Sequence, residues 1–324
     1  AGWVVSNESF MDNVSDVVSF AKIRGSWGNI GDQSVSNSLY VPTMDITKNN
    51  WLNGSGQQFF QLGTPGAVST AITWQDIEHS NIGADLRFFN KLGVTLEYFQ
   101  RNTNNMIIPG ESLPNTFGAS APQGNFGTLQ TRGWEINLDF NHRFDNGLRL
   151  TANANLADAV SKIVKGADWN TPWENRLLSN AYATGRTFGD IYGYVTDRLY
   201  QAEDFVYDAN GNHEVTTVIH EGAARQTNLL SGNNPVYQTL LQTGTQPWGF
   251  IAPGDVKFVD VNGDGYITNG TNTNGDPGDR VKIGNSTPRY EYGFRLGADY
   301  KGFDFSVFMQ GVGQREIWGA GQLA

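Results

Sequence analysis

A short acidic segment of the chain has the spacing of a calcium-binding loop. Hard cations such as Ca²⁺ prefer oxygen ligands, which such loops supply from positions 1, 3, 5 and 7 and from a carboxylate at position 12. Position 12 is Thr271 here, so a later acid would have to complete the set. One hypothesis is a structural Ca²⁺ in a surface loop, and the alternative is a metal-free turn in which Asp and Asn side chains bond their own backbone. The candidate ligands are Asp260, Asn262, Asp264, Tyr266 through its carbonyl, and Asp279.

Aromatic residues are frequent in the long segments that lack a regular pattern. Exposed Trp and Tyr rings could stack on sugars or grip peptide side chains, and the alternative is that they pack the loops or form a membrane-interface belt. Trp169, Trp173 and Trp248 are the candidate substrate-binding residues. The other loop aromatics are Trp51, Phe59, Phe60, Tyr182, Tyr200, Tyr237 and Phe250.

No arrangement of residues typical of an enzyme is found. The chain has no cysteine, and its four histidines do not pair at helical spacing with a glutamate. No G-x-S-x-G motif is present either. We therefore expect no catalytic activity. The histidines are His79, His142, His213 and His220.

The composition excludes several classes of protein. A formal charge of −10 without any Lys/Arg run disfavours nucleic acid as a partner. The chain contains no stretch of about 18 apolar residues, the length that a transmembrane helix needs. The mean hydropathy of −0.40 is compatible with barrel strands, since half of each such strand is polar. No signal peptide is visible, so either it was removed or the sequence is an internal piece of a longer chain, and we expect the internal piece.

Apolar and polar residues alternate over ten or more positions in several segments, which predicts β-strands with one apolar and one polar face. In the segment from Trp134, the apolar Ile136 and Leu138 alternate with Glu135 and Asn137. The expected strands are Phe20–Gly28, Asn81–Phe89, Leu92–Thr103, Thr131–Arg143, Leu148–Val160, Arg289–Tyr300 and Phe303–Val312.

Short and long connections alternate between these strands. Tight turns are expected at Asn90-Lys91, 144–147 and Lys301-Gly302, whereas 29–80, 104–130 and 161–288 are long. One or two helical turns around Asp12–Val18 are the expected exception. Outer-membrane barrels have short periplasmic turns, long extracellular loops and a charged interior. A soluble β-sandwich shares the alternation but not the loop asymmetry. We therefore predict that residues 1–324 form an all-β, antiparallel, partial transmembrane β-barrel.

Charges of both signs occupy the polar positions of these strands. In a plugged barrel they would pair mainly with one another and with the plug, and only a few would touch solute. They are Lys22, Arg24, Asp85, Arg87, Glu97, Arg101, Glu135, Asp139, Arg149, Glu291 and Arg295.

An ordered set of segments resembles the SusC/RagA-type TonB-dependent outer-membrane transporters. Each match is short, but together they run in family order from about Glu8 to Arg315. The segments are 20–33, 81–90, 96–103, 106–107, 125–135, 189–194, 253–265, 292–294, 300–306 and 308–311.

This resemblance implies part of a 22-stranded barrel whose N-terminal plug and energy-coupling box lie outside this chain. It implies a bacterial outer-membrane location, with lipid around the barrel, a SusD-like surface lipoprotein as lid and TonB as energy source. The implied function is import of large nutrients, either oligosaccharides or oligopeptides. The rival interpretations are a passive porin-like channel and a soluble β-rich glycan-binding module.

Overall fold

The computed structural model describes residues 1–33, 39–110, 113–119, 121–166, 183–220, 223–238, 250–271, 273 and 275–317. Within it the chain divides into two compact units. The first unit consists of Ala1–Asp168, Tyr182–Gly189 and Ser286–Ile317, and the second of Trp169–Ala181, Asp190–Asn285 and Trp318–Ala324.

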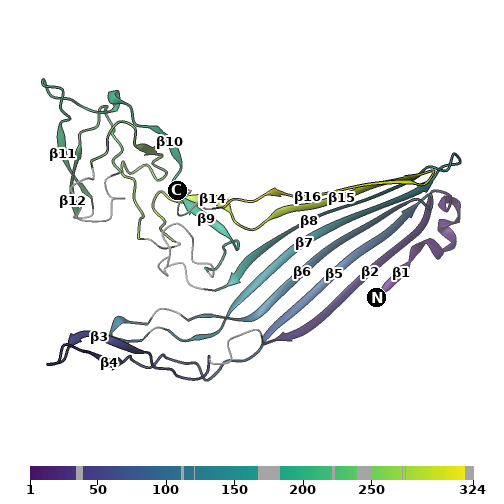
Figure 1. Cartoon of the computed structure of the whole chain (residues 1–324), viewed down its shortest axis with the longest axis horizontal. Helices are drawn as coiled ribbons and strands as arrows, with labels where there is room; N and C mark the ends of the chain where they lie inside the picture. Colours follow the sequence, from purple (N-terminus) through teal and green to yellow (C-terminus); the bar gives the residue numbers. More distant parts are fainter. Residues whose placement is uncertain are drawn as a thin grey trace. The chain divides into compact units, whose positions relative to one another are not determined.

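The first unit is built on one eight-stranded antiparallel sheet. Its strands lie in the order β1-β2-β5-β6-β7-β8-β15-β16, which follows their order in the chain, although other strands intervene between β2 and β5 and between β8 and β15 (Figure 1). The strands are β1 (Gly2–Val4), β2 (Val18–Asp32), β5 (Gln75–Phe88), β6 (Leu92–Pro109), β7 (Gln123–Arg143), β8 (Arg149–Lys165), β15 (Arg289–Tyr300) and β16 (Phe303–Gln314).

All seven strands expected from the alternation are present, and most are longer than expected. β6 continues to Pro109, past the expected end at Thr103, and β7 begins at Gln123, before the expected start at Thr131. The segments expected to be loops therefore carry part of the sheet. The helical turns also lie earlier than expected, as two 3₁₀ helices, η1 (Val5–Asn7) and η2 (Ser9–Val14).

Tight turns join the hairpins at the expected places. In the β5–β6 turn Asn90 has a φ of 56°, and in the β15–β16 turn Gly302 has a φ of 89°. The left-handed backbone suits two-residue turns because it matches the strand twist. No helix in the described ranges is long and apolar enough to cross a membrane.

One of the long connections forms a further hairpin that the alternation did not predict. β3 (Ile46–Leu52) pairs with β4 (Gln58–Leu62), with an irregular register between Lys48 and Leu52. Many of its large side chains are exposed, including Trp51 at 77% and Phe60 at 71%. A single 3₁₀ turn, η3 (Asn115–Phe117), lies in the next connection.

The second unit contains short strand pairs around a small apolar core. Tyr200, Phe205, Leu230 and Ile251 are buried together, and Tyr237 packs against them. Pairing joins segments distant in sequence, since β9 and β14 contribute residues up to 95 positions apart. The elements are β9 (Asp190–Gly193), β10 (Thr196–Leu199), η4 (Ala202–Asp204), β11 (Val215–His220), β12 (Ala223–Asn228), β13 (Val256–Phe258) and β14 (Val281–Asn285).

Candidate functional site

The register of the large sheet gathers its apolar residues on one face. Residues directly opposite each other on paired strands share a face, and Leu96 pairs with Ile136, which pairs with Leu156. We call this surface the apolar band. On β15 it runs from Tyr292 to Tyr300, about nine residues, close to the roughly 9–11 residues that a tilted strand needs to cross a bilayer. Its main members are Ile23, Trp27, Ile82, Leu86, Phe88, Leu92, Val94, Leu96, Tyr98, Trp134, Ile136, Leu138, Phe140, Leu150, Leu156, Tyr292, Phe294, Leu296, Tyr300, Phe303, Phe305 and Met309.

None of these band residues is buried. Leu138 is 40% exposed and Leu296 is 50% exposed, while Leu150 and Phe294 are partly exposed. A soluble sandwich covers the apolar face of each sheet with a second layer. Here the described residues leave the band open.

Aromatic residues gather at both ends of the apolar band. Tyr98 and Trp134 lie opposite each other near the long-loop end, and Phe140 lies near the tight-turn end. Such rings at both margins are typical of the two interfaces of a membrane barrel.

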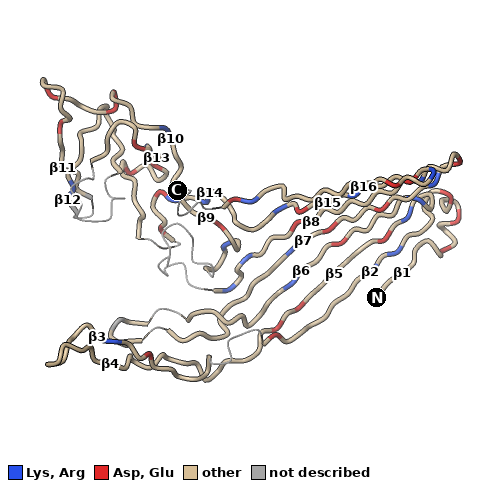
Figure 2. The backbone as a smooth tube through the Cα atoms, viewed as in Figure 1, with Lys and Arg blue, Asp and Glu red and all other residues tan. Residues whose placement is uncertain are grey.

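The opposite face of the sheet is polar and carries paired charges. The Arg24 guanidinium on β2 donates to Asp85 on β5 at 3.1 Å and also pairs with Glu97 on β6. Asn81 donates to the same Glu97 carboxylate at 3.2 Å. Both signs of charge follow the strands of the sheet (Figure 2). The expectation that inner-face charges pair with one another is confirmed for this group.

A glycine makes room for the Arg24 pairing. A Cβ at Gly83, directly opposite Arg24 on β5, would lie 2.9 Å from the guanidinium carbon. The guanidinium therefore passes over the Gly83 backbone to reach Glu97 on the next strand.

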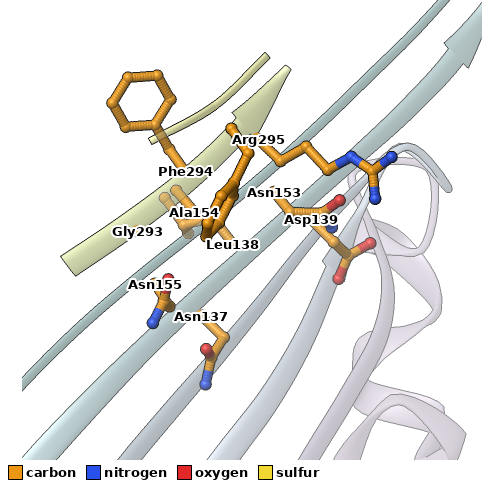
Figure 3. A pocket seen from close by; sticks show the side chains of 10 residues that line it. Asn137, Leu138, Asp139, Asn153, Ala154, Asn155, Gly293, Phe294 and Arg295 are labelled. Carbon is orange, nitrogen blue, oxygen red and sulfur yellow. The ribbon is translucent and has the colours of Figure 1, made fainter. Parts of the chain in front are cut away.

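A shallow pocket of about 210 Å³ lies over β7, β8 and β15. On the polar side, Asp139, Asn153 and Arg295 stand in one row across the three strands. Figure 3 shows that Arg295 and its neighbour Phe294 extend to opposite sides of β15. Phe308 on β16 lies opposite Arg295, so this polar row ends in an aromatic ring. A group bound on the polar side could therefore contact amides, one positive and one negative charge, and an aromatic ring.

The acidic loop in the second unit is held by its own hydrogen bonds. Asp260 accepts hydrogen bonds from the backbone N–H groups of Gly263 at 2.7 Å and Gly265 at 2.8 Å. Asn262 and Asp264 accept in the same way from residues two positions later. The carbonyl oxygen of Tyr266 is the fourth candidate ligand. These are the bonds of the Asx-turn alternative.

Asp279 returns to this loop, as the calcium hypothesis requires. Its carboxylate is fully buried and accepts from the N–H groups of Val261 at 2.9 Å and Thr268 at 2.7 Å. Burial raises the pKa of the Asp279 carboxyl, against the opposing effect of these backbone donors. Among the described residues no three acidic or histidine side chains form a ready metal site. Calcium binding here stays a prediction.

The three substrate-binding candidates Trp169, Trp173 and Trp248 lie outside the described residues, as does Tyr182. Of the other loop aromatics, Tyr200 is 2% exposed and Tyr237 packs beside it. These two therefore pack the second unit. Trp51, Phe59 and Phe60 instead stay exposed on the β3–β4 hairpin.

Comparison with known proteins finds relatives that cover almost the whole chain. The TonB-dependent receptor P26 of Formosa agariphila is 24% identical over 333 aligned residues, covering 98% of this chain and 28% of the receptor. The TonB-dependent receptor P39 of the same organism is 26% identical, covering 94% of this chain and 28% of that receptor. No protein-family model matches the chain.

Solved structures of a peptide importer share the fold. The RagAB importer in its "closed-closed" state aligns with a TM-score of 0.59 at 17% identity, covering 96% of this chain and 28% of that chain. Its "open-open" state gives the same TM-score at 14% identity. Over about 95% of its length, this chain is similar to a barrel portion of the SusC/RagA-type TonB-dependent receptors.

The chain spans only about 28% of the length of the curated relatives it matches. The relatives are named as receptors and importers, which agrees with the expectation that this chain is not an enzyme. The main signals of the family were readable in the sequence. The polar pocket of Figure 3 was missed, because it depends on which strands become neighbours.

Proposed function

We propose that this chain forms part of the wall of an outer-membrane importer that draws its energy from TonB. The observation that carries the proposal is the open apolar band on a sheet whose other face is charged and paired. Lipid tails are the environment in which an uncovered band of this kind is stable, and an enclosed aqueous or plugged interior suits the opposite face. The names of the curated relatives support energy coupling through TonB.

The complete barrel would have 22 strands, with the plug and the energy-coupling box supplied by parts of the receptor outside this chain. A SusD-like surface lipoprotein would act as its lid, an inference supported by the likeness to the RagAB importer. The connections 29–80 and 161–288 are the proposed lid contacts. The exposed β3–β4 hairpin in the first of them supports this assignment.

The solute would be a large nutrient, an oligopeptide or an oligosaccharide. The description of RagAB as a peptide importer favours the oligopeptide. Trp169, Trp173 and Trp248 are proposed to contact it at the extracellular mouth. Replacing all three with alanine in the complete receptor should weaken solute binding more than replacing Trp51, and equal effects would contradict their role.

Uptake by cells that carry the complete receptor tests energy coupling. We expect uptake to stop when the proton-motive force is collapsed or TonB is removed. Uptake that continues under both conditions would instead indicate the passive porin-like channel.

Fractionation tests the membrane assignment. We expect the receptor in the outer-membrane fraction, released only by detergent, because the apolar band requires lipid or detergent around it. Release by salt or buffer alone would indicate the soluble glycan-binding module.

A further inference from the structure

Beyond the aromatic margin of the apolar band, the same face of the sheet becomes polar. Gln100 pairs with Arg132, and Asn102 pairs with Gln130, which pairs in turn with Lys162. These five residues, which we call the outer collar, continue the rows of Tyr98 and Trp134. They therefore point to the side on which the band lies, at the end nearer the long loops.

Hydrogen bonds join four of the five residues of the outer collar, all except Lys162, into a ladder. Arg132 Nε donates to the Gln100 side-chain oxygen at 3.0 Å. The amides of Gln100 and Gln130 both donate to the Asn102 side-chain oxygen, at 3.3 Å and 3.1 Å. The ladder spans β6 and β7 and fixes the stem of Arg132.

Two positive charges of the outer collar lack an acidic partner. Arg132 lies opposite Val160, so Lys162 is its diagonal neighbour on β8, at a Cα separation of roughly 7–8 Å. Both side chains are exposed, and neither has an ion pair within the described part of the chain.

The nearest acids on this face have other partners. Asp158, two residues from Val160, is bound by Arg289. Glu78 accepts a hydrogen bond from Trp27 at 2.8 Å and lies on β5, separated from Arg132 by a whole strand. Among the described residues, no acid is therefore left to pair with Arg132 and Lys162, and the two can bind an external anion.

We propose that the outer collar binds the phosphorylated sugar headgroup of a glycolipid in the outer leaflet. Arg132 and Lys162 would hold the phosphate, and the amides of the ladder would hydrogen-bond the sugar. This inference rests on the proposed function, because the band must face lipid for the collar to lie at headgroup level. The aromatic margin places the collar just beyond the hydrocarbon, where basic side chains reach anionic headgroups.

Glycolipid binding by the complete receptor in nanodiscs tests the proposal. The probes are a phosphorylated lipopolysaccharide and the same lipid after enzymatic dephosphorylation. We expect R132Q/K162Q to bind the phosphorylated lipid roughly ten- to thirtyfold more weakly, with little change for the dephosphorylated lipid. Equal affinities of wild type and double variant would overturn the proposal.

Arg101 supplies a matched control, because it is the neighbour of Gln100 and points to the polar face. R101Q should bind the phosphorylated lipid as the wild type does, and a loss as large as that of R132Q/K162Q would show that only net charge matters. Fractionation distinguishes a failure of the proposed function from a failure of the outer collar to bind lipid. A receptor absent from the outer membrane contradicts the proposed function, whereas one present there with unchanged lipid binding contradicts the outer collar alone.

Discussion

The carboxylate of Asp204 in the second unit binds two groups close to it in the chain, the Arg198 side chain and the Gln201 backbone. It receives two hydrogen bonds from the Arg198 guanidinium, at 2.5 and 2.6 Å, and a third from the backbone N–H of Gln201 at 2.8 Å. The Arg198 hydrogen bonds and the Gln201 backbone donor hold the pKa of the Asp204 carboxyl well below its usual range. Next to this group, burial raises the pKa of the Tyr200 hydroxyl to about 12.

The Asp204 group should make the second unit sensitive to acid. Because the folded-state pKa is lowered, its stabilisation is complete above the unfolded-state pKa of about 4 and is lost as the pH falls below that value. D204N should therefore lose less stability than the wild type between pH 6 and pH 3. Chemical unfolding of the complete receptor, followed by fluorescence at both pH values, provides the measurement.

Asp197 offers the control for this comparison. Its carboxylate is 4.0 Å from the same guanidinium and its side chain is largely exposed. D197N should keep the pH dependence of the wild type. If D204N also kept it, the Arg198 contact would not stabilise the fold.

Asp260 determines the shape of the acidic loop whether or not calcium binds. D260A removes the acceptors of two backbone N–H groups and should lower the free energy of unfolding by about 1–2 kcal/mol in chelator. If calcium binds, titrating the wild type with calcium should also release or absorb heat, and this heat should disappear in D260A. Identical calorimetric traces for the wild type and D260A would mean that the motif is a hydrogen-bonded turn without calcium.

At the scale of the strand, neighbouring residues on β7 face different surroundings. Leu138 belongs to the apolar band, and Asn137 beside it faces the polar side between Thr95 and Asn155. L138R should destabilise the barrel by about 2–4 kcal/mol, the cost of an arginine at the bilayer midplane, whereas N137R should change little. The amount of folded receptor that survives heating in SDS gels measures the difference. Similar losses in both variants would mean that the band does not face lipid.

The strands that cross this band were predictable because their alternation is local. Each has a tight turn at one end, and in the β15–β16 turn Gly302 itself marks the left-handed position. The ends of the strands nearer the long loops were not predictable. From Asn102 to Asn105 the residues are polar on both faces, so alternation disappears although the backbone pairing continues.

The strands of the second unit could not be predicted from the sequence, for a different reason. β9 and β14 are four and five residues long and pair across a large sequence separation. No local sequence pattern therefore predicts them. The acidic loop was visible in the sequence, and so was the possible return of Asp279. The sequence offered bonding to the backbone only as one of two alternatives, and the structure shows that each carboxylate of the loop has backbone donors.

At the scale of the whole molecule, the large sheet is open at both edges. β16 pairs with β15 on one side, and the opposite edge is formed by β1 and the free part of β2. Within the described residues the outer edge of β16 has no partner strand. Unpaired N–H and C=O groups cost several kcal/mol each in a bilayer, because no water is present to satisfy them. Residues 1–324 alone should therefore fail to form a stable membrane-inserted barrel.

Refolding into lipid vesicles tests this dependence on the rest of the receptor. The complete receptor should become protease-resistant and migrate differently in SDS gels before and after heating. Residues 1–324 expressed alone should stay protease-sensitive or aggregate through the edge of β16, since an open strand pairs readily with another chain. A protease-resistant, heat-modifiable monomer of this chain alone would show that its sheet closes on itself. The 22-stranded assignment would then be wrong, because the wall would need no strands from outside the chain.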